Sequence, residues 1–270
     1  MSTLPLSDIY IKNGLARPAR TRDGLDVVIR VIVIGDEGHD HLNILRRIAT
    51  GEKSLFSNNH ALPMFAEFQF EDIIFGIFPQ VGSGISYAYG CWAKNSVGDI
   101  IEMLLQMLEV RFTLHVLPPF LKVQKLKALV FIHDLNIAHR VSTLSFVIFL
   151  ARIFKFLCQD AFRDNFVIQW HPESLRTMKI SFTRPRVYLI DFEVAIQFPA
   201  ECPETERLSM GLPLGGSFTY PEKYGRPHAP ECAPGMAYSP FKLDVWQLGI
   251  SFSDFKVRHS FHIFACYLLA

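Results

Sequence analysis

Two groups of polar residues near the middle of the chain have types that suit a metal-dependent site. His139-Arg140 ends one segment, and residues 160–165 (D-A-F-R-D-N) begin another, with the nineteen residues 141–159 between them. A further carboxylate, Asp191, follows the apolar run 187–190. Carboxylate and amide oxygens are hard ligands that suit Mg²⁺, and an arginine can hold a neighbouring segment through charge-assisted hydrogen bonds. These residues therefore indicate a metal-dependent site if the fold brings them together.

Without residues 141–159, the two groups read H-R-D-A-F-R-D-N, which fits the protein-kinase catalytic-loop pattern H-R-D-x-x-x-x-N. Four further partial matches occur in the order that protein kinases show: residues 27–30 for V-A-I-K, 190–193 for D-F-G, 220–222 for A-P-E and 244–249 for the D-x-W-x-x-G start of a long buried helix. Four segments resemble the protein-kinase-like proteins that are expanded in mushroom-forming fungi: N-S-V-G-D at 95–99, Q-W-H-P-E-S-L at 169–175, Y-L-I-D-F-E at 188–193 and L-D-V-W-Q-L-G-I-S-F at 243–252. The resemblance covers residues 15–256, less two insertions.

The resemblance implies a role for each matching residue. Asp160 would orient a substrate hydroxyl and accept its proton, while Asn165 and Asp191 would hold the Mg²⁺ ions that bridge the phosphates of ATP. Arg140 would hold the activation segment, and Arg30 would contact the nucleotide phosphates.

The same resemblance implies a fold, namely a two-lobe α+β domain. Residues 1–80 would form a small lobe with an antiparallel sheet and one helix, and residues 81–270 a mainly helical, truncated large lobe. Residues 78–82 resemble the hinge between the lobes, which places Phe78 among the cofactor-binding residues.

Several positions depart from the kinase pattern. Arg30 replaces the strand lysine, and a planar guanidinium fork does not imitate a point charge. His41 stands where the helix should supply a glutamate partner, with Asp40 and Glu37 as near misses. No G-x-G-x-x-G precedes the strand, and Glu193 adds a negative charge where D-F-G has glycine. The ion pair of Arg30 and the phosphate-binding loop are therefore in question.

Two apolar insertions interrupt the resemblance, at residues 110–127 and 141–159. Removing the first joins Glu109 to Ala128 and continues one apolar helical stripe, and removing the second restores the catalytic-loop pattern. Both insertions begin with valine and end with lysine or glutamine, whose codons can supply the boundary dinucleotides of introns. We interpret them as translated introns, with residues 257–270 as a third case. Genuine loops are the alternative, although long loops are usually polar or functional.

Local patterns predict the elements of the first part of the chain. Residues 25–34 are β-branched and apolar, which indicates a buried strand, and residues 22–24 before them form a turn. Residues 38–49 have apolar positions at helical spacing. Two further strands are expected at 65–70 and 73–78, and a helix should continue from residue 128 into the segment before His139.

Composition limits the partners and the compartment. The net charge of +1 gives no reason to expect nucleic acid. Five scattered cysteines without a C-x-x-C suit a reducing compartment. The apolar run 147–151 is interrupted by Arg152 and Lys155, and it is shorter than the ~20 residues of a spanning helix. A membrane anchor and a signal peptide are therefore not expected, and the location is predicted to be cytoplasmic or nuclear.

Two functions of different classes follow. The first is ATP- and Mg²⁺-dependent phosphoryl transfer to Ser or Thr of a protein substrate, performed by the chain without its insertions. The second is a non-catalytic, pseudokinase-like scaffold. The chain as written favours the second, because residues 141–159 separate Arg140 from Asp160 and a misplacement of ~1 Å can lower a rate about 10²-fold.

Overall fold

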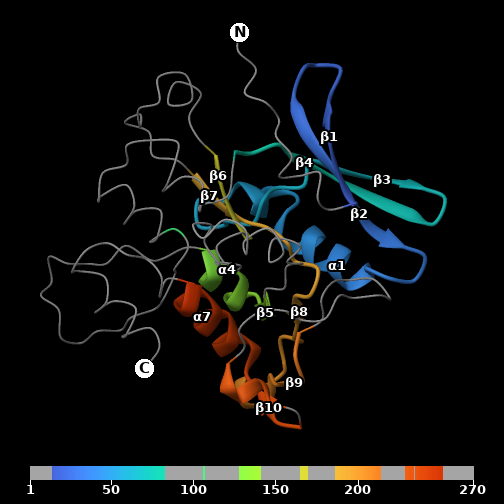
Figure 1. The fold of residues 1–270 in the computed structure, drawn as a ribbon. Helices are drawn as coiled ribbons and strands as arrows, with labels where there is room; N and C mark the ends of the chain where they lie inside the picture. Colours follow the sequence, from blue (N-terminus) through green and yellow to red (C-terminus); the bar gives the residue numbers. More distant parts are fainter. Residues whose placement is uncertain are drawn as a thin grey trace, which may run out of the picture.

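The structure, a computed structural model, describes residues 14–82, 106, 128–140, 165–169, 186–213, 229–233 and 235–251. These residues form a mixed α+β structure with small antiparallel sheets and few helices (Figure 1). The insertions 110–127 and 141–159, the tail 257–270, Asp160 and residues 220–222 lie outside the described residues.

A four-stranded antiparallel sheet forms the first part of the described chain, with the strand order β1-β2-β4-β3. Its strands are β1 (Ala16–Arg20), β2 (Asp26–Ile34), β3 (Ala66–Phe70) and β4 (Ile73–Pro79). The predicted strands at 25–34, 65–70 and 73–78 are confirmed within one residue at each end. The turn before β2 is closed by the hydrogen bond from Thr21 N to Leu25 O, at 2.9 Å.

Helix α1 (His39–Ile48) confirms the helix expected at 38–49. Its buried residues are Leu42, Ile44, Leu45 and Ile48, together with His41, so the apolar spacing does define its inner face. Gly38, which begins the helix, has φ 91°, and its close approach to the Ile32 carbonyl leaves no room for a side chain. A short 3₁₀ helix, η1 (Glu52–Leu55), follows α1.

The later elements are short. The helices are α4 (Ala128–Asp134) and α7 (Pro240–Ser251), with 3₁₀ turns η4 (Glu204–Glu206) and η5 (Pro230–Cys232). The strands form three two-stranded antiparallel sheets. They are β5 (Ile137–Ala138) with β8 (Ile196–Gln197), β6 (Phe166–Gln169) with β7 (Arg186–Leu189), and β9 (Ser209–Met210) with β10 (Ala237–Tyr238). Helix α4 begins where the interrupted helix was expected to resume.

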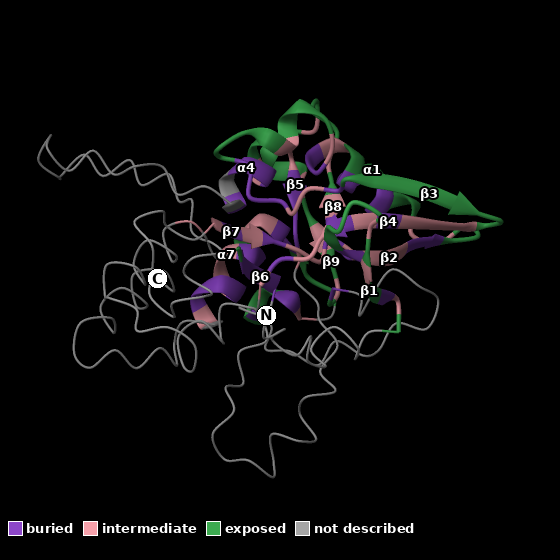
Figure 2. Ribbon diagram, turned by 90° about the horizontal axis from the view of Figure 1, so that it is seen from above, coloured by how far each residue is buried: buried purple, intermediate pink, exposed green. Residues whose placement is uncertain are grey.

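One hydrophobic core joins these elements. The core includes one residue from each of five elements, and each is at most 3 % exposed: Ile32 of β2, Leu45 of α1, Ile132 of α4, Ile168 of β6 and Leu248 of α7. Figure 2 shows the buried residues gathered where the sheet, α1, α4 and α7 meet. Chain segments that are remote in the sequence are therefore fixed against one another. In the described part of the chain, no helix is both long enough and apolar enough to cross a membrane.

Candidate functional site

An ion cluster joins the centre of β2 to the segment after β7. Arg30 Nη2 lies 2.8 Å from Asp191 Oδ1, and the same nitrogen contacts the carboxylate of Glu193. The three side chains are only 16, 13 and 12 % exposed, respectively. Asp191 has a left-handed backbone, with φ 72°, which is uncommon for a residue other than glycine. We call Arg30, Asp191 and Glu193 the Arg30 cluster.

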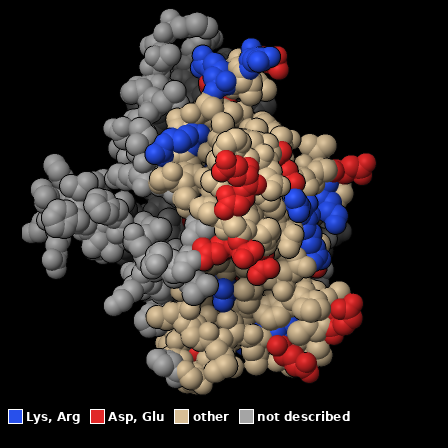
Figure 3. All heavy atoms as spheres, turned by 90° about the vertical axis from the view of Figure 1, so that its right-hand side faces the viewer, with Lys and Arg blue, Asp and Glu red and all other residues tan. Residues whose placement is uncertain are grey.

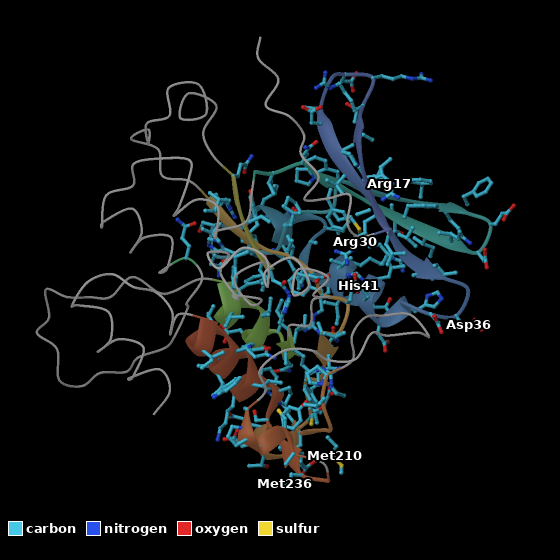
Figure 4. The ribbon with its side chains drawn as sticks, viewed as in Figure 1. Arg17, Arg30, Asp36, His41, Met210 and Met236 are labelled. Carbon is cyan, nitrogen blue, oxygen red and sulfur yellow. The ribbon has the colours of Figure 1, made fainter. Side chains whose placement is uncertain are left out.

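His41 of α1 lies close to Arg30 in the middle of the molecule (Figure 4). Its side chain is buried, and its pKa is lowered well below the ordinary value of 6.5. Burial is the main cause, because it disfavours the charged ring, and the electrostatic interactions with Arg30 and His139 act in the same direction. Helix α1 therefore places a neutral imidazole near Arg30, and the carboxylates come from the segment after β7 instead.

The backbone of Ile190 connects the two flanks of the segment 141–159. The ring of His139 donates from Nε2 to Ile190 O at 2.9 Å, and Ile190 N donates to Asn165 O at 2.9 Å. Both His139 and Asn165 are buried, at 0 and 1 % exposure. The ring of His139 also packs edge-on against Phe192, with centroids 4.7 Å apart. His139 and Asn165 are thus both held beside Asp191, although twenty-five residues separate them in the sequence.

Asp244 of α7 holds the end of the His139-Arg140 segment. Its carboxylate accepts hydrogen bonds from His139 N at 2.8 Å, from Arg140 N at 2.7 Å and from His133 Nε2 at 2.9 Å. Asp244 is 2 % exposed, so these donors replace water around a buried carboxylate. Arg140 has φ 51°, and the two backbone bonds to Asp244 stabilise this uncommon conformation.

The side chain of Arg140 binds the segment that follows Asp191. Its Nε donates to Val194 O at 2.9 Å and its Nη1 to Ser209 Oγ at 3.1 Å. Burial lowers the pKa of the guanidinium, and the neighbouring Tyr238 and Asp244 oppose that shift. The contact to Ser209 connects Arg140 to β9.

Phe78 is the remaining predicted site residue that the structure describes. Phe78 is 7 % exposed and belongs to the hydrophobic core. Its ring packs over Gly76, where an added Cβ would approach Phe78 Cε2 to 2.8 Å. Gly76 of β4 pairs with Arg30 of β2. The Phe78 ring therefore packs on the residue that lies next to Arg30 in the sheet. Asp160, the expected base, lies outside the described residues.

The carboxylate of Asp191, a predicted Mg²⁺ ligand, is bound by a cationic side chain in this structure. One oxygen of that carboxylate is already bound by the cationic Arg30, and a metal ion would have to compete with a charge of the same sign. Within the described ranges, no group of three or more His, Cys, Asp or Glu side chains could hold a metal ion. Arg30, Asp191 and Glu193 pair with one another in a mostly buried ion network.

Sequence patterns did not reveal Glu193 as a partner of Arg30. The signal that could have shown it is the change from lysine to arginine together with two carboxylates at 191 and 193, because a guanidinium can bind two acceptors through its planar fork.

Comparison with models of protein families and with curated proteins gave no match to the chain.

Proposed function

We propose that this chain is a protein-kinase-like domain whose nucleotide site is closed by its own side chains, so that it acts as a non-catalytic protein-binding scaffold. The observation that carries the proposal is the ion pairing of Arg30 with both Asp191 and Glu193. In protein kinases the strand cation must pair with a helix glutamate while the D-F-G aspartate holds Mg²⁺. Here the corresponding cation and aspartate bind each other.

Electrostatics supports the same conclusion. Two carboxylates against one guanidinium give the Arg30 cluster a formal charge of −1, and the depressed pKa of His41 keeps its ring neutral at pH 7. A nucleotide phosphate would meet a negative cluster and would have to separate its ion pairs. Removing one partner of a buried pair costs about 3–5 kcal/mol, and 3 kcal/mol corresponds to more than a hundredfold in affinity.

Phosphoryl transfer from ATP to Ser or Thr of a protein substrate is the second candidate. It is favoured by the contacts of His139 and Asn165 with Ile190. In a chain without residues 141–159, only residues 160–164 would connect Arg140 to Asn165, which would keep Asp160 near Asp191. A cytoplasmic or nuclear location belongs to both candidates.

Thermal unfolding with ATP, with Mg²⁺ and with both separates the candidates. The measurement uses the full chain and a chain lacking residues 110–127 and 141–159. We expect no nucleotide-dependent increase in Tm for either chain. An increase with ATP and Mg²⁺ in both would contradict the scaffold, and an increase in the shortened chain alone would support phosphoryl transfer by that form. Asp191→Asn in the shortened chain is the control, since it should abolish a Mg²⁺-dependent increase.

A further inference from the structure

Strand β3 lies at the edge of the four-stranded sheet and is exposed along its whole length (Figure 2). Its sequence, A-E-F-Q-F, is mainly apolar. Phe68 and Phe70 are 42 and 63 % exposed, and Phe65 just before the strand is 57 % exposed. Phe68 stacks on Phe75 of β4, with ring centroids 4.7 Å apart, so the aromatic surface of β3 is held in one place.

The other edge of the sheet differs from β3. Strand β1 contains Pro18 and exposed arginines at 17 and 20, and proline and basic residues are the usual means by which proteins prevent an edge strand from pairing with another chain. Strand β3 has neither. Its one charged residue, Glu67, is bound by Arg46 of α1 through hydrogen bonds of 3.0 and 2.7 Å. Among the strands that the structure describes, β3 is therefore the sheet edge that is open to a further strand.

We propose that two copies of this chain associate by antiparallel pairing of their β3 strands, with Phe68 on the two-fold axis. An exposed edge strand presents unpaired backbone groups at alternate residues, which a second strand can satisfy. Pairing in this way would join the two four-stranded sheets into one. It would also shield Phe68 and Phe70 from water.

The side chains of β3 select this register. With Phe68 on the axis, Glu67 lies opposite Gln69 of the second copy, and Phe70 lies opposite the small Ala66. An axis at Glu67 would place the two Glu67 carboxylates opposite each other, and an axis at Gln69 would place Glu67 opposite Glu71. Like charges directly opposite each other destabilise paired strands, so the axis at Phe68 is the favoured choice.

The charges at the two ends of β3 select the antiparallel direction. Glu71 and Asp72 are exposed beyond the end of the strand. The hydrogen bond from Met64 N to Ala49 O, at 2.8 Å, places its beginning beside the end of α1, where Arg46 and Arg47 lie. Antiparallel pairing brings the acidic end of each copy to the basic end of the other. Figure 3 views the molecule from the right-hand side of Figure 1, the side toward which β3 points. Acidic and basic side chains both occur on this face.

Sedimentation of the full chain over a concentration series tests the pairing. We expect a reversible monomer–dimer equilibrium. Gln69→Lys should lower the dissociation constant, because it places a cation opposite Glu67 twice in the dimer, and Gln69→Glu should raise it. Each change should be about 2- to 30-fold for two symmetry-related pairs. A folding defect cannot produce opposite effects from two substitutions at one exposed position.

Phe70→Lys should also weaken the dimer, because it places a charge on the exposed apolar edge. Phe56→Lys is the matched control: Phe56 is 49 % exposed but lies outside the sheet, and its substitution should leave the dissociation constant unchanged. A wild-type chain that stays monomeric at every concentration would overturn the proposal. So would association that Gln69→Lys and Gln69→Glu change equally or not at all.

Discussion

Arg30 and Asp191 are 161 residues apart in the sequence, yet Arg30 Nη2 lies 2.8 Å from Asp191 Oδ1. Glu193 contacts the same guanidinium nitrogen. The Arg30 cluster therefore ties the first sheet to the segment after β7 through charges that are largely withdrawn from water. Arg30 is the one cation of this cluster, and without it both carboxylates would lose their partner; a buried charge without a partner costs several kcal/mol.

Arg30→Ala should lower the free energy of unfolding by about 3–5 kcal/mol, since it leaves two partly buried carboxylates beside each other without a cation. Arg30→Lys should cost less, because an ammonium retains the charge but loses the fork. Urea unfolding at pH 7.5 measures both changes.

The exposed ion pair between Arg20 and Asp26 provides the matched control. These side chains are 64 and 45 % exposed, and exposed ion pairs contribute little to stability because water screens them. Arg20→Ala should therefore lower the unfolding free energy much less than Arg30→Ala. If Arg20→Ala and Arg30→Ala have equal effects, the Arg30 cluster does not have the energetic role described above.

The elements that could be predicted are those with a local signal. Strand β2 has a long β-branched run, and α1 has apolar residues at helical spacing, so both were located within one or two residues. The two-residue strands β5, β8, β9 and β10 were not expected. A strand of two residues has no run or alternation to read, and it exists only because another segment lies beside it.

The sequence predicts some of the candidate residues, but it does not predict Glu193 as a partner of Arg30. Arg30, Asp191 and Arg140 were identified from motif order, which is a property of the sequence. The position of His139 and Asn165 depends on the backbone of Ile190, and any residue other than proline at 190 would supply the same carbonyl and amide groups. No residue type therefore signals this contact.

Acidification should destabilise the protein through His41. The unfolded chain takes up a proton on this ring as the pH falls through about 6.5, whereas the lowered pKa keeps the folded ring neutral. Unfolding then binds a proton, so stability is fully present above pH 6.5 and is lost below it. The slope contributed by one such group approaches 1.4 kcal/mol per pH unit. Urea unfolding at several pH values between 5 and 8 measures it.

Substituting His41 distinguishes its contribution to the pH dependence of stability from the contributions of other titrating groups. His41→Leu should reduce the slope below pH 6.5 by about one proton, whatever its effect on stability at pH 7.5. Asn43→Leu, an exposed polar position on the same helix, should leave the slope as it is in the wild type. An unchanged slope in His41→Leu would show that another group causes the acid sensitivity.

Asp244→Ala should destabilise the protein by about 2–6 kcal/mol. It removes the acceptor of two backbone N–H groups, at His139 and Arg140, and each buried donor left without a partner costs about 1–3 kcal/mol. Lys242→Ala, at an exposed position of α7, should cost less than 0.5 kcal/mol, roughly the effect of a neutral surface change. Thermal and urea unfolding of both variants compare them, and equal effects would contradict the importance of the Asp244 hydrogen bonds.

Gly38 should tolerate no side chain, because two separate effects oppose one. Its φ of 91° is in the left-handed region, and a Cβ would press on the Ile32 carbonyl, with its carbon atom only 3.1 Å away. Gly24 has a similar φ of 83° but open space around its Cβ position. Gly24→Ala should therefore cost ~1–2 kcal/mol from backbone strain alone, and Gly38→Ala a further ~1–3 kcal/mol from overpacking. Urea unfolding of the two variants isolates the steric effect, and equal costs would mean that β2 and the start of α1 can move apart without loss.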